Sequence, residues 1–171
     1  NLNPSTQLAI LRDIVEVLNR QGIQRLLVLN SHGGNDFKPI LRELGLKFPE
    51  MFLLTCNWFL AAERKAFFDS PGDHADEMET SIMQHLRPDL VLALSEAGEG
   101  KEHKSKLTGI REGWAWSERL WSQVSDDTGI GSPAAATPAK GKAFFEATTR
   151  NIAQLLQELA ATDPKDRYRR G

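Results

Sequence analysis

Apolar residues recur at intervals of three and four along residues 5–20, a spacing that places them on one face of an amphipathic helix. The positions are Leu8, Leu11, Ile14, Val15 and Leu18. Gly22 follows where a helix C-terminus is expected. The continuous apolar run over residues 26–29 then predicts a short strand that is buried on both faces of a parallel sheet.

Helices and strands continue to alternate along the chain. Helical spacing returns over residues 37–44, and residues 51–56 form a second apolar run that predicts a strand. We expect a further helix over residues 73–86, a third short strand over residues 90–94, and a last helix that starts at residues 137–138. This order predicts an α/β protein whose helices pack on a sheet.

Composition excludes several classes of protein. The chain has 171 residues, of which 40% are hydrophobic and 26% charged, with a formal net charge of -2, so disorder and a nucleic-acid-binding surface are both disfavoured. No apolar run approaches the roughly 18 residues that span a bilayer. The single cysteine, Cys56, cannot form an internal disulfide, and we interpret it as a core residue. We therefore expect a cytoplasmic protein whose main partner is neither a nucleic acid nor a membrane.

A polar, glycine-rich segment follows the first predicted strand and contains a candidate functional histidine. It reads Asn30-Ser31-His32-Gly33-Gly34-Asn35. Ligands of open α/β sheets bind beyond the carboxyl ends of the strands, where His32 lies. The two glycines allow a tight turn, and both asparagines can hydrogen-bond the backbone. An ordinary strand-to-helix turn with an incidental histidine explains this segment equally well, and a phosphate-binding turn would need further glycines.

A second candidate segment is the acidic helix start over residues 73–81. His74 and Glu77 are three residues apart, so on one helix face both would point at one metal or substrate. The preference of acids for helix N-termini explains Asp76 and Glu77. It explains Glu79 poorly, because Glu79 falls within an apolar stripe and would bury a carboxylate. The members of that stripe are Met78, Ile82, Met83 and Leu86.

Taken together, the two segments resemble the creatininase (creatinine amidohydrolase) family. The motifs that carry the resemblance are Asn30-Ser31-His32-Gly33-Gly34-Asn35 and His74-Ala75-Asp76-Glu77-Met78-Glu79-Thr80-Ser81, with a further turn at residues 126–129. The resemblance covers nearly the whole chain. It implies a three-layer α/β fold with a mostly parallel sheet flanked by helices. It also implies a metal-dependent hydrolase with a small-molecule substrate, in which it cleaves a non-peptide C–N bond of a cyclic amide or formamide. A homo-oligomer such as a hexamer is implied as well.

The resemblance also implies roles for individual residues. His32 would be a metal ligand, and Glu77 would replace the acid that some relatives carry at the position of Gly34. His74 would donate a proton to the leaving nitrogen, and Glu79 would orient His74 or a ligand. The intact site would hold two divalent metal ions, and zinc, manganese or iron would suit such ligands.

Some features depart from the family pattern. Its Glu-x-His pair and bridging Asp come from a preceding region, so we expect residues 1–171 to be a single α/β domain, the C-terminal portion of a creatininase-family domain without that metal-ligand segment. Asp76 stands where the family usually has Gly, and residues 69–72 contain no aromatic lid, which disfavours creatinine as the substrate. Three clustered tryptophans fit core packing, a substrate pocket or a subunit interface, and their place in a weakly periodic segment favours the interface: Trp114, Trp116 and Trp121. The alternative function is a non-catalytic subunit that binds a small ligand or serves a structural role.

Overall fold

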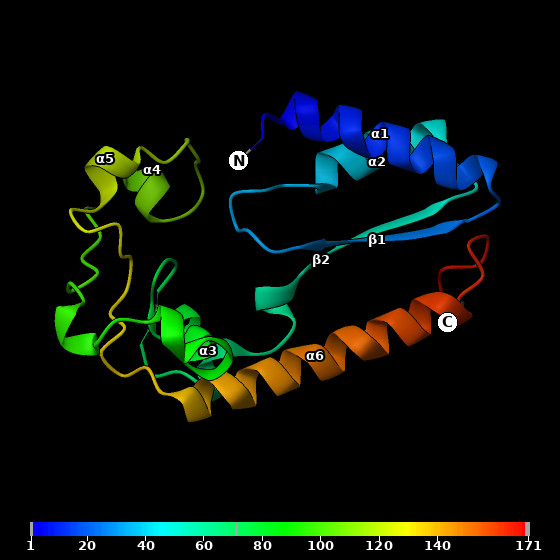
Figure 1. The fold of residues 1–171 in the computed structure, drawn as a ribbon. Coiled ribbons are helices and arrows are strands. Elements are labelled where there is room, and N and C mark those ends of the chain that lie inside the picture. The colour runs from blue at the N-terminus through cyan, green and yellow to red at the C-terminus, as the bar shows by residue number, and fades with distance from the viewer. Residues whose placement is uncertain (1, 71, 170–171) are drawn as a thin grey trace. The chain divides into compact units, whose positions relative to one another are not determined.

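The structure is a computed structural model that describes residues 2–70 and 72–169 (Figure 1). The chain divides into two compact units, one formed by Asn1–Ala62 with Thr148–Gly171 and the other by Glu63–Ala147. The helices and strands are α1 (Pro4–Arg20), β1 (Arg25–Asn30), α2 (Lys38–Lys47), β2 (Phe52–Asn57), α3 (Glu77–Leu86), α4 (Thr108–Arg111), α5 (Trp121–Val124) and α6 (Pro138–Ala161). Four short 3-10 turns complete them: Trp58–Leu60, Arg64–Ala66, Pro88–Leu90 and Leu94–Glu96.

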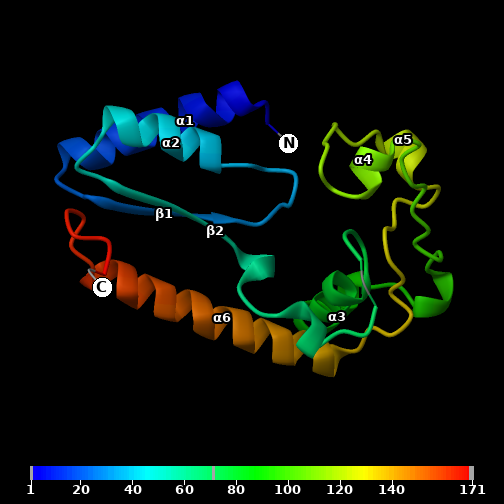
Figure 2. The same ribbon diagram turned by 180° about the vertical axis from the view of Figure 1, so that it is seen from behind.

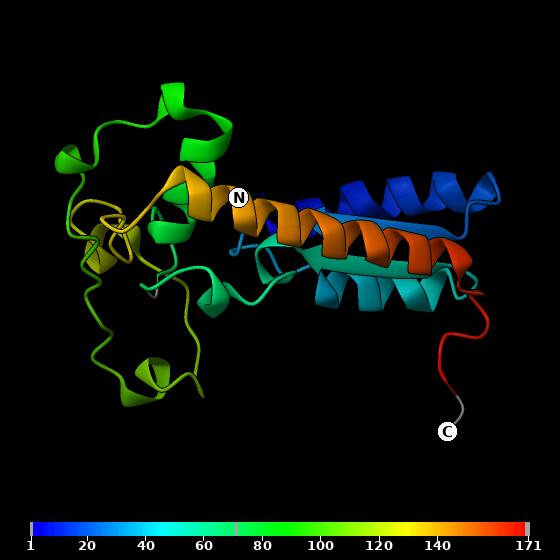
Figure 3. The same ribbon diagram turned by 90° about the horizontal axis from the view of Figure 1, so that it is seen from below.

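The first unit has three layers, as the α/β prediction requires. β1 and β2 pair in parallel, with Arg25 opposite Phe52 and Asn30 opposite Asn57. α2 provides the crossover connection that a parallel pair needs. Helices α1 and α2 cover one face of the strands, and the C-terminal part of α6 lies on the other face (Figures 1 and 2). Seen from below, α1 and α2 lie next to each other beyond the strands (Figure 3).

The core of this unit lies between α1, α2 and the strands. The buried cluster consists of Val15, Ile40, Leu44 and Met51. Half-buried leucines and phenylalanines from the same elements surround it. The amphipathic spacing along residues 5–20 therefore predicts α1 and its buried face correctly. The strands are only half-buried, contrary to the prediction of burial on both faces, because in the described chain each has one unpaired edge.

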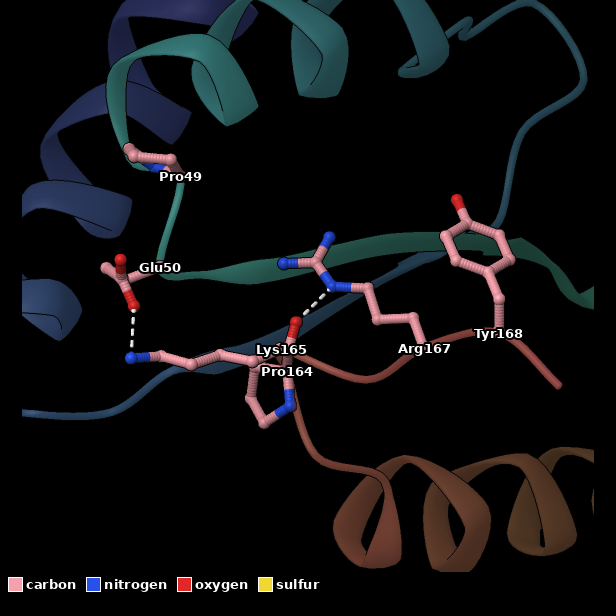
Figure 4. Close-up of a pocket in the computed structure, with 6 residues that line it drawn as sticks. All are labelled: Pro49, Glu50, Pro164, Lys165, Arg167 and Tyr168. Atoms are coloured by element: carbon pink, nitrogen blue, oxygen red, sulfur yellow. Dashed lines mark hydrogen bonds and ion pairs between the residues drawn. The ribbon is translucent and has the colours of Figure 1, made fainter. Parts of the chain in front are cut away.

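The segment after α6 returns to the edge of this unit and borders a hollow of about 450 Å³ (Figure 4). Arg167 donates to the carbonyl of Met51 at 3.0 Å, and its guanidinium lies 4.6 Å above the ring of Phe52. Lys165 forms an ion pair with Glu50 at 3.1 Å. Both cations that line this hollow therefore have partners at the start of β2, and these contacts attach the segment after α6 to that end of the strand.

The second unit packs α3 against the first turns of α6. Gly141 is required there, because a Cβ at this position would lie 1.9 Å from the carbonyl oxygen of Ser81. The buried hydroxyl of Ser81 also accepts a hydrogen bond from the amide of Thr137 at 3.1 Å. Phe67 and Phe68 pack edge-on against the fully buried ring of Phe144. These contacts fix the start of α6 beside α3.

One predicted element of this unit is wrong, and another is present but starts later than predicted. Residues 90–94 do not form a strand, because 3-10 turns at Pro88–Leu90 and Leu94–Glu96 flank three residues that have no ladder partner among the described residues. The helix predicted over residues 73–86 begins only at Glu77. Its start is delayed because His74 pairs with Ile130 in an isolated bridge and Ala75 has a φ of 49°.

No helix among residues 2–70 and 72–169 combines the length and the apolar character that crossing a bilayer would require.

Candidate active site

The loop after β1 is organised around the buried side chain of Asn30. Its amide donates to the carbonyl of His32 at 3.0 Å and to Oδ1 of Asn57, at the end of β2, at 2.8 Å. Its Oδ1 accepts from the backbone amide of His32 and from the side chain of Asn35, both at 3.2 Å. Asn35 is held in turn by Gln7 of α1 at 2.8 Å. These contacts confirm that the two asparagines stabilise the tight loop.

His32 is exposed at the apex of this loop. Its Nδ1 accepts a hydrogen bond from the backbone amide of Gly34 at 3.0 Å. This bond leaves the proton of the neutral imidazole on Nε2. Among the described residues, none donates to Nε2 or accepts from it. The loop therefore presents an imidazole on a rigid base, beyond the carboxyl end of β1.

His74 lies in the other unit, just before α3, and its backbone is fixed by a short bridge. Its carbonyl accepts from the amide of Ile130 at 2.8 Å, and its own amide donates to the carbonyl of Ile130 at 3.2 Å. The imidazole side chain is 43% exposed, and Nδ1 lies 3.9 Å from Oε2 of Glu79. The prediction that His74 and Glu77 share a helix face is wrong, because the helix starts after His74.

Glu79 is partly exposed rather than buried, which corrects the sequence interpretation. Its side chain is 42% exposed, and Oε2 accepts from the backbone amide of Ala75 at 2.7 Å. The amide of Glu79 donates to Oδ1 of Asp76 at 2.9 Å, so Asp76 caps the helix while the Glu79 carboxylate holds the residue before the cap. The buried face of α3 consists of Glu77, Met78, Ser81 and Ile82. It includes Met78 and Ile82 of the predicted stripe, whereas Met83 and Leu86 are exposed.

The buried acids are Asp76 and Glu77, and each has a cationic partner. Asp76 forms an ion pair with Arg64, and the absence of a side chain at Gly72 leaves room for it, since a Cβ there would lie 2.3 Å from the Cβ of Asp76. The Glu77 side chain has an exposure of 0% and is paired with Lys140 of α6. Neither cation was predicted, because both are distant in sequence and follow no motif.

Three donors surround the carboxylate of Glu77. Oε2 accepts from the backbone amides of Asp69 at 3.0 Å and Ser70 at 2.7 Å, and Oε1 accepts from the ammonium of Lys140. Hydrogen bonds from Lys140 to Asp69 and to Glu77 raise the pKa of the Lys140 ammonium. The Lys140 ammonium is therefore charged at neutral pH.

The turn at residues 126–129 joins two loops of the second unit through Asp127. Its carboxylate accepts from the hydroxyl of Ser125 at 3.0 Å, from the amide of Gly129 at 2.9 Å and from the amide of Gly100 at 3.4 Å. These bonds, led by that of Ser125, lower the pKa of Asp127. Because Ile130 follows immediately, Asp127 supports the strand segment that bridges to His74.

Of the three clustered tryptophans, only Trp121 contacts a candidate site residue. Its ring centroid lies 4.8 Å from that of His74. Trp114 and Trp116 are exposed, by 74% and 86%. The prediction that these tryptophans form an interface stays a prediction. Cys56 is half-buried and burial raises the pKa of its thiol, which favours its interpretation as an unreactive packing residue.

A hollow of about 450 Å³ in the second unit is lined in part by Glu79. Ala75, Glu79 and Thr80 form one wall, and mostly apolar side chains of residues 90–94 form another. Glu79 is thus in contact with both His74 and a space that a small molecule can enter. The segment mistaken for a strand lines this space instead.

Within residues 2–70 and 72–169, no three His, Cys, Asp or Glu side chains are grouped so as to hold a metal ion. His32 still has the properties of a ligand, because its imidazole is exposed and Nε2 is uncommitted. Glu77 is less available as a metal ligand. A carboxylate offers about four lone-pair positions, and its three hydrogen-bond donors leave one of them unoccupied. The predicted convergence of His32 with Glu77 stays a prediction, since the two residues belong to different units.

Comparison with known proteins agrees with this set of features. The sequence profile described as Creatininase: creatinine amidohydrolase matches residues 1–156. A protein from Bacteroides fragilis, provisionally identified as a creatinine amidohydrolase, has a similar structure with a TM-score of 0.89 and 38% sequence identity. The match covers 99% of this chain and 66% of that one, so this chain spans just under two thirds of the relative.

Two more distant structures share the fold. A creatininase variant in complex with creatine has a TM-score of 0.68 at 20% identity, over 95% of this chain and 67% of that one. A manganese creatininase has a TM-score of 0.68 at 21% identity, over 92% and 65%. No curated protein sequence matches the chain significantly. The profile match over residues 1–156 and the shared three-layer fold lead to one conclusion: the chain belongs to the creatininase family.

Proposed function

We propose that the protein is a metal-dependent amidohydrolase that cleaves a non-peptide C–N bond in a cyclic amide or formamide. The observation that carries the proposal is the setting of His74, a partly exposed imidazole next to Glu79 and close to a hollow, in a chain of the creatininase family. His32 and Glu77 would be the metal ligands that this chain supplies. We further expect a cytoplasmic homo-oligomer, which sedimentation analysis would test.

His32 would bind the metal through one ring nitrogen. Binding through Nε2 requires the proton to move to Nδ1, which breaks the hydrogen bond from Gly34. Binding through Nδ1 replaces the same bond with the metal. In both cases metal binding competes with the Gly34 amide, so the loop must adjust when the site fills. The Asn30 network would keep the backbone of the loop in place during this adjustment.

Glu77 would use its one remaining lone-pair position for the metal. Lys140 would stay beside it and reduce its effective charge, which weakens the attraction to a cation. When bound, the metal ions would supply hydroxide at neutral pH and polarise the substrate carbonyl. Zinc, manganese or iron would suit a mixed set of imidazole and carboxylate ligands.

His74 would donate a proton to the leaving nitrogen. The imidazole side chain is 43% exposed, which lets it reach a substrate and act as a general acid. Glu79 would stabilise the protonated form through its carboxylate, 3.9 Å from Nδ1. The mostly apolar wall over residues 90–94 would exclude water from one side of the substrate.

A specific observation favours the alternative, a non-catalytic subunit that binds a small ligand. Glu77 is fully buried and already neutralised by Lys140, which is the arrangement of a structural ion pair. A protein with this pair kept intact could retain the fold and the hollow without a metal centre.

Metal analysis of the full-length protein separates the two functions. The hydrolase should bind Mn²⁺ or Zn²⁺, lose thermal stability when a chelator removes the metal, and hydrolyse a formamide or cyclic amide. His32→Ala should reduce metal occupancy, whereas the control His85→Ala on α3 should not. His74→Ala should keep the metal and lower turnover by about 100-fold. A protein that binds no metal and melts identically in chelator would contradict the hydrolase proposal.

A further inference from the structure

Arg119 and Trp121 contact the two successive residues Asp73 and His74. The ring centroids of Trp121 and His74 are 4.8 Å apart, with the ring planes at 58°. The guanidinium carbon of Arg119 lies 5.1 Å from the centroid of the Trp121 ring, within the range of a cation–π interaction. A nitrogen of the same guanidinium forms an ion pair with Asp73 at 2.6 Å. One short segment therefore contacts the side chains of two successive residues.

The helix that carries Trp121 is itself held at its other end. α5 has only four residues, so its own hydrogen bonds cannot fix it. The backbone amide of His103 donates to the carbonyl of Val124 at 2.8 Å, and Nδ1 of His103 lies 3.2 Å from the carbonyl oxygen of Gln123. Nε2 of the same ring lies 3.2 Å from a carboxylate oxygen of Asp126. These contacts hold α5 where Trp121 meets His74.

The imidazole of His74 has few other restraints. The bridge to Ile130 fixes its backbone but leaves the side-chain torsions free. Glu79 is 3.9 Å from Nδ1, which is too far for a hydrogen bond. The Trp121 indole is the large surface against which the imidazole packs, and tilted ring contacts of this kind favour a particular orientation.

We propose that Trp121 is a positioning residue that sets the orientation of the His74 imidazole, and that Arg119 holds Trp121 in place by pairing with Asp73. The catalytic consequence rests on the proposed role of His74 as a proton donor. The contact itself does not depend on that role. The contact with His74 also distinguishes Trp121 from Trp114 and Trp116, which lie in the same stretch of sequence and are more exposed.

Nuclear magnetic resonance of the imidazole ring tests the positioning directly. The chain has four histidines, so the His74 signal of the full-length protein can be assigned from its loss in His74→Gln. Trp121→Leu should shift the His74 ring signal, because the ring current of the indole is lost. Trp121→Phe, which keeps an aromatic ring at this position, should leave the His74 signal close to its wild-type position. Trp116→Leu, the matched control at an 86% exposed position, should leave the His74 signal in place.

Arg119→Gln provides a second variant that leaves the indole intact. Loss of the ion pair to Asp73 should move the His74 signal in the same direction as Trp121→Leu, but less. If Trp121→Leu does not fold, Arg119→Gln decides the question. A His74 signal that stays unchanged in Arg119→Gln and in folded Trp121→Leu, or that moves as far in Trp116→Leu, would overturn the proposal.

Kinetics add a readout that depends on the proposed function. In the metal-loaded protein, Trp121→Leu should lower kcat and kcat/KM together by about 10- to 100-fold, as expected when a reacting group loses its alignment. Unchanged kcat despite a shifted His74 signal would show that the orientation is irrelevant to catalysis. If the wild type hydrolyses no amide, the proposed function fails, while the shift of the His74 signal still decides the positioning role.

Discussion

The loop after β1 and the start of α3 carry the two motifs of the chain, and they are stabilised in opposite ways. Neutral amide groups centred on Asn30 hold the loop together, so the imidazole of His32 stays exposed. Ion pairs hold the helix start together, with Arg64 on Asp76 and Lys140 on Glu77. A motif rich in ionisable groups is therefore not equivalent to a set of available ligands.

The difference follows from the charge that each region must bury. A buried asparagine needs only hydrogen bonds, which neighbouring backbone groups supply. A buried carboxylate needs a counter-charge, and the second unit supplies two cations from outside the motif. Among the candidate site residues of the second unit, those left accessible are His74 and Glu79, the two acid–base candidates.

Glu77→Gln should give the largest effect, because it removes the buried charge that Lys140 neutralises. We expect the free energy of unfolding in urea to fall by about 3–5 kcal/mol, the range measured when one partner of a buried pair is removed. Glu79→Gln is the matched control on the same helix, and its loss should stay below about 1 kcal/mol because the side chain is 42% exposed. Equal losses in both variants would refute the contrast between the two acids.

Asn30→Ala should have an intermediate effect on the free energy of unfolding, through the loop after β1. The change leaves the backbone amide of His32 and the side chain of Asn57 without partners, so we expect a loss of about 1–3 kcal/mol. Hydrogen exchange should also become faster over residues 31–36. Unchanged exchange in this loop would show that Asn30 does not organise it.

Asp127→Asn should give the smallest effect and should depend on pH. The folded protein lowers the pKa of Asp127, so the stabilisation is complete above the unfolded pKa of about 3.9 and is lost as the pH falls through the folded value. The difference in Tm between wild type and variant should therefore be largest near neutral pH and shrink below about pH 4. A difference that stays constant from pH 7 to pH 3 would contradict this account.

Sequence patterns predict the fold of the first unit better than the site of the second. The spacing in α1 and the apolar runs of β1 and β2 depend on local burial, which the sequence records directly. The run over residues 90–94 was misleading, because an apolar stretch lines a hollow as readily as it enters a sheet. Lys140 could not be predicted, because it reaches Glu77 from 63 residues away.

The position of Glu79 shows how a small error in a helix start changes a site. A helix from residue 73 would place Glu79 in the apolar stripe, whereas a helix from Glu77 places it in the first turn as part of the cap. The backbone contacts of His74 with Ile130 cause the later start, and they involve a partner 56 residues away. Local spacing carries no information about such a contact.

Anomalous diffraction from crystals of the full-length protein grown with Mn²⁺ would test the central claim most directly. The account predicts a manganese peak at a coordination distance of roughly 2.0–2.3 Å from a ring nitrogen of His32, with an oxygen of Glu77 in the same coordination shell and the Gly34 hydrogen bond lost. A peak that involves neither residue, or Glu77 still bound only by Lys140, Asp69 and Ser70 beside a filled metal site, would contradict it.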